Sequence, residues 1–224
     1  MTTDPGSELD EQSKDNTPRR LLDTAARLWS EKGYAATSVR DITTTANCNL
    51  ASINYYFGGK QGLYEQVFKE ILGNLREQRI SAVSQVLNNA IISKDIEKVL
   101  RAFAESFLKP LMNQKRGQIM IQLFNREMSD PQLPPTMFIE EMVEPIQKMM
   151  VRAMRSIYPK MSINTATMCL HSLVAQLIHL VQTRKFFTEA GRVNTVMSDM
   201  DRLAEHTVQF SAAGVRMYVN DQQA

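Results

Sequence analysis

Two neighbouring stretches decide the fold of this chain: YAATSVRDITTTA at residues 34–46 and NLASINYYFGGKQGL at residues 49–63. In the first stretch, Ser38 is a good cap for a short helix whose apolar side chains, among them Ile42 and Ala46, recur at helical spacing. The second stretch begins another short helix only two residues later. Two short helices joined so tightly predict a helix-turn-helix.

The second of these helices closes with three adjacent aromatic side chains, Tyr55, Tyr56 and Phe57, before two glycines and Lys60. Successive helical side chains are turned by about 100°, so three adjacent rings cannot share one buried face. At least one of the rings must therefore be exposed. In the turn between the helices, Asn47 takes the position where glycine is commonest, because asparagine tolerates the left-handed backbone conformation.

The segments that flank this motif are also informative. Residues 1–16 are polar and mostly acidic, and we expect them to form a disordered tail. A helix is expected at about 18–32, because Thr17 can cap it and apolar residues recur at helical spacing until Gly33. A long amphipathic helix is expected from Lys60 onward.

The remainder of the chain shows helical periodicity without convincing period-two alternation, which favours an all-α architecture over an α/β one. Pro145 lies inside one expected helix, where it removes a backbone hydrogen bond and should kink or divide that helix. The further helices are expected near residues 96–112, 117–128, 135–157, 164–187 and 196–219.

Composition narrows the class of protein. The chain has 224 residues, is 43% hydrophobic and 22% charged, and carries a net charge of +2. No apolar run approaches the roughly 20 residues that cross a bilayer, and no secretory signal is recognisable. A soluble, cytoplasmic protein is therefore expected, without contact to a membrane. Cys48 and Cys169 match no metal or redox spacing, so we expect no metal ion and no cofactor.

The motif residues resemble the DNA-binding domain of the TetR family of bacterial transcriptional regulators. The resemblance covers about residues 18–65 and rests on LLDTAARLWSEKG, YAATSVRDITTTA and NLASINYYFGGKQGL. These runs give a helix ending in glycine, a T-S-x-R-x-I start, and a short helix closing with aromatic-Phe and G-G-K. Two pairs depart from the pattern of the family: Asn47-Cys48 replaces the usual Gly-Val, and Gly58-Gly59 replaces a more typical pair. Neither departure removes an expected DNA contact.

The resemblance implies which residues touch double-stranded operator DNA. The helix at residues 49–57 would be the recognition helix, entering the major groove with its N-terminus first. Asn54 could read a base edge or a phosphate, Arg40 a base or a phosphate, and Leu50 a thymine methyl group. The expected DNA-binding residues are Thr37, Ser38, Arg40, Asn49, Leu50, Ala51, Asn54, Tyr55, Tyr56 and Lys60.

Two of these expectations have a plain structural alternative. Arg40 could form an ion pair with Asp41 or with a neighbouring helix instead of reaching DNA. The ring of Tyr56 could pack on the first helix, with its hydroxyl merely solvated, rather than donating to a phosphate oxygen. Phe57, one turn beyond Ile53, is expected to pack in the core of the three-helix unit.

The resemblance divides the chain into three parts: the acidic tail at 1–16, the helix-turn-helix domain at 17–63 with a linking helix from about 60, and a helical effector-binding and dimerisation domain at 64–224. Within the last part, the run from Phe124 to Met150 resembles a TetR subgroup that contains the regulator called CecR or YbiH.

Methionine and phenylalanine side chains cluster in the C-terminal part. Such side chains can line an adaptable apolar cavity, and they can equally fill an ordinary core. We therefore hypothesise a small, largely apolar effector. The expected pocket residues are Phe103, Phe107, Met120, Phe124, Met142, Met149 and His171.

The last two expected helices carry apolar residues on more than one face, so one face is available for a partner. The resemblance implies a two-fold homodimer with a four-helix interface there. The expected interface residues are Leu173, Leu177, Leu180, Val208 and Val215.

The sequence thus favours a dimeric repressor that binds a palindromic operator and is released when an effector changes the spacing of its recognition helices. A dimeric DNA-binding regulator without a small-molecule ligand is the alternative. An all-helical enzyme is disfavoured, because His171, His179 and His206 lack a ligand set and no nucleophile has an evident base. The G-G-K run also lacks the frame of a phosphate-binding loop.

Overall fold

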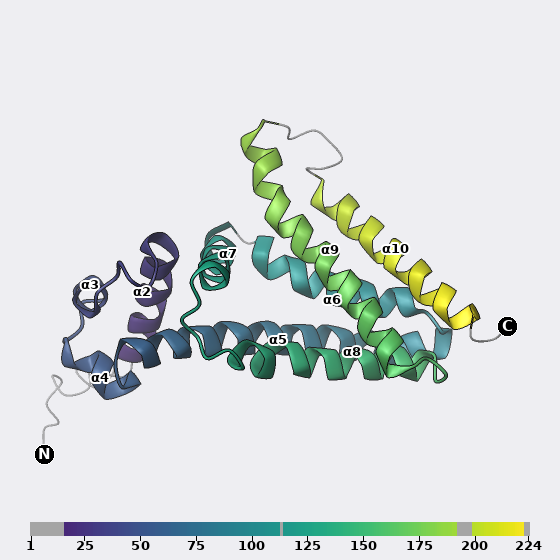
Figure 1. Cartoon of the computed structure of the whole chain (residues 1–224), viewed down its shortest axis with the longest axis horizontal. Helices are drawn as coiled ribbons and strands as arrows, with labels where there is room; N and C mark the ends of the chain where they lie inside the picture. Colours follow the sequence, from purple (N-terminus) through teal and green to yellow (C-terminus); the bar gives the residue numbers. More distant parts are fainter. Residues whose placement is uncertain (1–15, 113, 192–198, 222–224) are drawn as a thin grey trace, which may run out of the picture. The chain divides into compact units, whose positions relative to one another are not determined.

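The computed structural model describes residues 16–112, 114–191 and 199–221. Every regular element within these ranges is helical, so the expected all-α class is confirmed. The expected acidic tail lies outside the described residues except for Asn16, which precedes the first helix. The helices are α2 (Thr17–Lys32), α3 (Val39–Thr45), α4 (Ala51–Phe57), α5 (Lys60–Ser93), α6 (Ile96–Met112), α7 (Gln114–Ser129), the π-helix η1 (Ile139–Val143), α8 (Glu144–Ile157), α9 (Ile163–Glu189) and α10 (Met200–Asp221) (Figure 1).

The chain folds into two compact units that are not contiguous in sequence. The first contains the residues up to Leu72 together with Gln114–Met137, and the second contains Gly73–Asn113 and the residues from Phe138 on. The unit that holds the helix-turn-helix is therefore larger than the expected segment at residues 17–63. Helix α5 contributes residues to both units.

The first unit has its core where α2, α3, α4, the start of α5 and α7 meet. Helix α7 packs against α2, and α3 and α4 pack against α2 and against each other. The rings of Trp29, Tyr34 and Tyr64 stack edge-on or tilted, with centroids 4.9–6.0 Å apart. Because α7 supplies Leu123 to the same core, it is an integral part of the first unit. The fully buried side chains of this core include Leu21, Ala25, Trp29, Ile42, Ile53 and Leu63.

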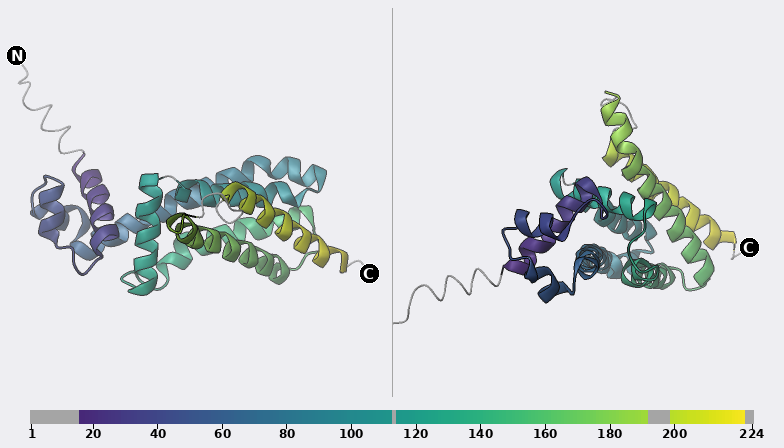
Figure 2. Two further views of the ribbon diagram at one scale, coloured as in Figure 1. Left: turned by 90° about the horizontal axis from the view of Figure 1, so that it is seen from above. Right: turned by 60° about the vertical axis from the view of Figure 1, so that its left-hand side comes forward.

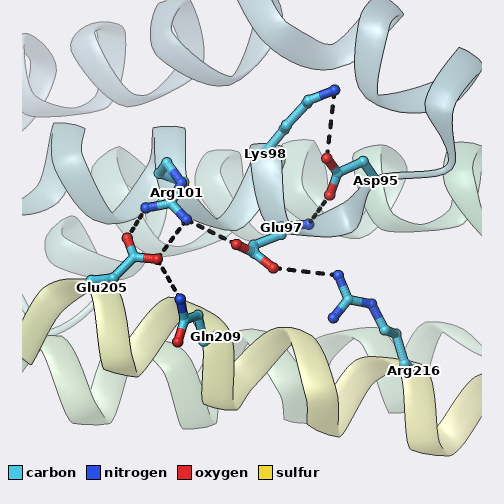
Figure 3. Close-up of polar contacts among 7 residues, drawn as sticks. All are labelled: Asp95, Glu97, Lys98, Arg101, Glu205, Gln209 and Arg216. Atoms are coloured by element: carbon cyan, nitrogen blue, oxygen red, sulfur yellow. Dashed lines mark hydrogen bonds and ion pairs between the residues drawn. The ribbon is translucent and has the colours of Figure 1, made fainter.

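In the second unit, α9 and α10 lie side by side in every view, α6 packs against α10, and α8 packs against α9 (Figures 1 and 2). A polar network joins α6 to α10 (Figure 3). Arg101 of α6 forms an ion pair with Glu205 of α10 and another, 2.8 Å long, with Glu97. Arg216 of α10 approaches the second oxygen of Glu97 at 3.4 Å. Such part-exposed pairs stabilise a fold by about 1 kcal/mol or less each, so their main effect is to fix the register of the two helices.

The helix expected at residues 135–157 is divided. The π-helical turn η1 covers Ile139–Val143, and α8 follows directly with Pro145 in its first turn. Because proline has no N–H, the carbonyl of Glu141, four residues earlier, loses its usual helical donor. Arg76 of α5 supplies a replacement, since its Nη1 lies 2.9 Å from the Glu141 carbonyl oxygen and 2.9 Å from the Glu141 carboxylate.

The last expected helix, at residues 196–219, corresponds to α10, which begins at Met200, and residues 196–198 lie outside the described ranges. Among the helices that the structure describes, none is both long enough and apolar enough to span a bilayer.

Candidate nucleic-acid interface

Helix α3 begins with a complete capping box. The Ser38 hydroxyl accepts a hydrogen bond from the Asp41 backbone N–H at 3.1 Å, while the Asp41 carboxylate accepts from the backbone N–H and the hydroxyl of Ser38 at 2.8 and 2.6 Å. These hydrogen bonds lower the pKa of Asp41. The start of α3 is therefore held in place by its own sequence, as the T-S-x-R-x-I pattern predicts.

The turn between α3 and α4 is held by a residue of α2. Asn47 has a positive φ of 50°, as its turn position requires. Arg20, from the first turn of α2, donates to the carbonyl of Ala46 and, at 2.8 Å, to that of Asn47. Sequence reasoning missed this role of Arg20, because no local pattern connects it to a turn more than twenty residues away.

Helix α4 buries Ile53 and rests the Phe57 ring against the core of the unit. Its other aromatic side chains face outward: Tyr55 is 82% exposed and Tyr56 40% exposed. Gly58 ends the helix in the left-handed conformation with φ of 71°, where a side chain would be strained. The three adjacent aromatic residues therefore divide into one ring on the core and two on the surface.

Most of the expected DNA-binding side chains share one property, which is exposure. Leu50 is 56% exposed at the N-terminal end of α4, and Asn49 accepts a hydrogen bond from the Ala51 backbone N–H at 2.9 Å. Within the described residues, the Arg40 side chain makes no hydrogen bond or ion pair, although its nearby charge helps to lower the pKa of Asp41. The exposed members of the set are Ser38, Arg40, Asn49, Leu50, Ala51, Asn54, Tyr55 and Tyr56.

Thr37 differs from the other expected DNA-binding residues. Its side chain is fully buried, and its hydroxyl donates to the carbonyl of Gly33 at 2.8 Å. The hydroxyl of Thr37 therefore closes the connection between α2 and α3 and has no access to a phosphate.

Lys60 lies half-buried at the start of α5, where its ammonium group is already in use. The Nζ atom donates to the carbonyl of Tyr34 at 2.6 Å and lies 4.1 Å from the centre of the Tyr34 ring. Burial lowers the pKa of Lys60. An ammonium group has three donors, so two remain beyond the one that fixes Tyr34.

Helix α7 fastens the far end of α2, a contact that sequence reasoning did not predict. The Arg126 side chain donates to the carbonyls of Ser30 and Glu31 at 3.0 and 2.6 Å, at the C-terminus of α2. Glu127 accepts a hydrogen bond from the buried Tyr64 hydroxyl at 2.8 Å. The second Glu127 oxygen accepts from the backbone N–H groups of residues 132 and 133. Adjacent side chains of α7 thus bind both α2 and α5 within the first unit.

The seven expected pocket residues do not all fall in one unit. Met120 and Phe124 belong to α7 in the first unit, where the Phe124 ring stacks edge-on against Phe68 with centroids 5.9 Å apart. In the second unit, the Phe103 and Phe107 rings lie 6.2 Å apart. Met142 is buried there, Met149 is half-buried, and His171 is exposed on α9.

The expected interface residues Leu173, Leu177, Leu180, Val208 and Val215 are buried inside the second unit, each less than 8% exposed. Their side chains belong to the layer in which α9 packs against α10 and its other neighbours in that unit. Other apolar side chains of the same two helices are exposed, at Met168, Ile178, Phe186, Phe210 and Met217.

The described residues hold no group of three or more His, Cys, Asp or Glu side chains that could bind a metal ion. Cys48 and Cys169 are free thiols, and burial raises the pKa of Cys169.

Comparison with known proteins agrees with this geometry. Residues 21–67 match the family of bacterial regulatory proteins called the tetR family, and residues 101–214 match the Tetracyclin repressor-like, C-terminal domain. The second match alone covers half of the chain. The chain therefore belongs to the TetR family of transcriptional regulators, which places it among DNA-binding regulators rather than enzymes.

Curated relatives share only part of their length with this chain. It is 36% identical over 73 residues to the "Probable HTH-type transcriptional regulator YttP" of Bacillus subtilis, which covers 33% of this chain and 35% of that protein. It is 42% identical over 50 residues to the "Biofilm operon icaADBC HTH-type negative transcriptional regulator IcaR" of Staphylococcus aureus, which covers 22% and 27%. The chain thus spans about a third or less of the length of these relatives.

A solved structure extends the similarity of fold to nearly the whole chain. A protein of Mesorhizobium loti assigned to the TetR family superimposes with a TM-score of 0.66 over 89% of this chain and 96% of its own. The identity of 18% shows that the two share a fold.

Proposed function

We propose that this TetR-family protein is a cytoplasmic, homodimeric repressor that binds a palindromic operator and is released by a small, largely apolar effector. The observation that carries the DNA-binding part is the contrast within the helix-turn-helix. Its frame is fixed by the Ser38–Asp41 capping box and by Arg20, while the exposed side chains of Arg40, Leu50 and Asn54 make no hydrogen bond or ion pair within the part of the chain that the structure describes.

In this proposal the N-terminal end of α4 enters the major groove. Asn54 offers an amide that can pair with adenine, Arg40 a guanidinium that can reach guanine or a phosphate, and Leu50 an apolar contact for a thymine methyl group. Tyr55 and Tyr56 donate to phosphate oxygens, and Lys60 adds a positive charge to the same strand. Thr37 is left out of this interface because its hydroxyl is buried.

The proposed dimer uses α9 and α10. On α9, Met168, Ile178 and Phe186 recur on one exposed stripe, and on α10, Phe210 and Met217 do the same. An exposed apolar stripe on two adjacent helices is the usual form of a face that pairs with its own copy. These residues, rather than the buried leucines and valines first expected, make up the proposed face. Both histidines of α9, His171 and His179, are also exposed.

The proposed effector binds in the second unit, where the buried side chains of Phe107 on α6 and Met142 in η1 both contact Arg79 of α5. Helix α5 contributes residues to both units and is the proposed lever that changes the spacing of the recognition helices. The resemblance of residues 124–150 to the CecR or YbiH subgroup stays a prediction, because the matched C-terminal family is described only as Tetracyclin repressor-like.

The decisive experiment is footprinting of the purified protein on genomic DNA, starting upstream of its own gene, followed by a screen for compounds that release the complex. A protected palindrome supports the regulator. The absence of a specific footprint anywhere in the genome would contradict the proposed DNA-binding function. A footprint that no compound releases would instead favour a regulator without a small ligand.

A further inference from the structure

Two arginines one turn apart on α5 have opposite surroundings. Arg76 is paired, since it donates at 2.9 Å to both the carbonyl and the carboxylate of Glu141. Arg79 is only 6% exposed, and within the described chain its guanidinium has no carboxylate, carbonyl or hydroxyl partner. A paired arginine and an unpaired one therefore lie on the same stretch of helix.

The contacts of Arg79 are apolar or weakly polar. Its Nη1 lies 3.0 Å from the Met142 sulfur, which is a poor acceptor. The guanidinium carbon lies 4.3 Å from the centre of the Phe107 ring, a distance typical of a cation–π contact. The buried Nε atom has no hydrogen-bond partner among the described residues.

This arrangement is energetically unusual. A guanidinium group stays charged in proteins and offers five N–H donors, so burying it without acceptors is costly. Burial lowers the pKa of Arg79 to about 10, which still leaves it charged at neutral pH. A ring face and a thioether offset part of the lost hydration, but the thioether takes only one N–H of Nη1, and among the described residues nothing accepts from the buried Nε. An anion bound here would supply the hydrogen-bond acceptors and the negative charge that the guanidinium group of Arg79 lacks.

The surroundings define the kind of anion. Phe107 and Met142 would lie against an apolar body, and two N–H groups of the guanidinium would donate to the two oxygens of one carboxylate. Met142 belongs to η1, and single π-helical turns are frequent at functional sites. We propose that Arg79 binds the carboxylate of an amphipathic effector, a monoacid whose apolar chain or ring packs against Phe107 and Met142.

This inference rests on the proposed function, because it assumes that the second unit binds an effector. It narrows the effector from largely apolar compounds in general to apolar monocarboxylic acids. It also makes Arg79 the residue that distinguishes an acid from the matching alcohol.

The first test needs no effector and compares the thermal unfolding of wild-type protein with Arg79→Met and Arg76→Met. If Arg79 waits for an anion, removing its unpaired charge leaves the melting temperature of the free protein unchanged or raised. Arg76→Met should lower it, because Glu141 loses its partner. A fall for Arg79→Met as large as that for Arg76→Met would show that Arg79 is a structural residue, and would overturn the inference.

The second test uses decanoate, decan-1-ol and decyltrimethylammonium as matched probes, with melting temperature and release of the footprinted operator as the two readouts. Decanoate should stabilise the wild type and release DNA, whereas the alcohol and the cation should do so roughly ten- to hundredfold more weakly. Arg79→Met should remove the advantage of decanoate over the alcohol, Arg79→Lys should keep part of it, and Arg76→Met should keep it whole.

Equal responses to the acid and the alcohol, or a full decanoate response in Arg79→Met, would overturn the role of Arg79, as would no response to any probe. Operator binding in the absence of probes is measured in the same experiment. If the wild-type protein bound no operator even without probes, the proposed regulator itself would be contradicted. Failure of the proposed function is therefore distinguishable from failure of the role of Arg79.

Discussion

Gly62, in the first turn of α5, lies directly against the backbone carbonyl of Phe57, the last residue of α4. A Cβ atom at position 62 would fall 1.9 Å from that oxygen, a distance that no real contact allows. The end of the recognition helix and the start of the long helix are thus packed backbone to backbone.

Replacing Gly62 with alanine should therefore displace α4 relative to α5. We expect Gly62→Ala to lower the free energy of unfolding by about 1–3 kcal/mol, as overpacking does elsewhere, and to abolish specific operator binding. Chemical denaturation and gel-shift titration measure the two effects. Gly73→Ala is the control, because a Cβ there would meet only the far end of the Arg76 side chain at 3.9 Å. Wild-type operator affinity in Gly62→Ala would contradict the packing argument.

Base reading is tested separately from binding strength. Arg40→Ala and Asn54→Ala should change which operator variants are preferred, because each side chain would lose its contact to a particular base edge at about 1–3 kcal/mol. Selection from a randomised operator library before and after substitution measures this. An unchanged preference in both variants would remove these residues from the reading surface.

Contacts to the DNA backbone should show a different signature. Lys60→Met should weaken binding to all operators alike and reduce the slope of log affinity against log salt by about 1. Lys148→Met, which removes an equally positive and well-exposed side chain from the second unit, should leave the slope unchanged. Tyr56→Phe should weaken binding uniformly, by about 1 kcal/mol, without altering the slope, since the lost group is uncharged.

The exposed apolar stripe of α9 and α10 makes a prediction about association. Phe210→Glu and Ile178→Glu should place a charge in the middle of the proposed dimer face and give a monomer at micromolar concentration. Light scattering coupled to gel filtration measures the mass. Ile92→Glu is the matched control, because Ile92 is 83% exposed on α5 and belongs to neither helix of the face. A dimeric Phe210→Glu protein would relocate the interface.

The capping box of α3 gives a prediction about pH. The hydrogen bonds from Ser38 lower the pKa of Asp41 in the folded state, so the ionised carboxylate stabilises the fold at pH values above its unfolded pKa, near 4. This contribution should be lost as the pH falls through the lower folded value. Asp41→Asn should flatten that part of the stability curve, measured by thermal unfolding between about pH 2 and 6. If stability fell equally at low pH in wild type and variant, protonation of Asp41 would not be coupled to folding.

Much of the fold could be predicted from the sequence because its signals are local. The Ser38 cap of α3, the positive φ of Asn47 and the division of a helix at Pro145 all depend on residues within one or two turns. Helical geometry required at least one of the three adjacent aromatic rings to be exposed, and the structure has Phe57 on the core with both tyrosines exposed.

The errors concern contacts between segments distant in sequence. The hydroxyl of Thr37 was expected to reach DNA on the sequence alone, but it is buried and donates to the carbonyl of Gly33. The ammonium group of Lys60 also binds a backbone carbonyl that the sequence did not indicate, but it keeps two further donors, so its contact to DNA stays a prediction. Arg126 and Arg20 reach backbone carbonyls that no periodicity identifies. The leucines of α9 were assigned to a partner face because periodicity alone does not tell which of two apolar stripes packs inside the chain.

The participation of α7 in the first unit affects how this molecule could be recombined. A fragment that stops at Leu72 would lack Leu123 from its core and the Arg126 side chain from the C-terminus of α2. A chimera that joins the first unit to the effector-binding domain of another protein must therefore also include Gln114–Met137. The DNA-binding unit is compact in space but is encoded in two separate segments, so three cuts in the gene, not one, are needed to isolate it.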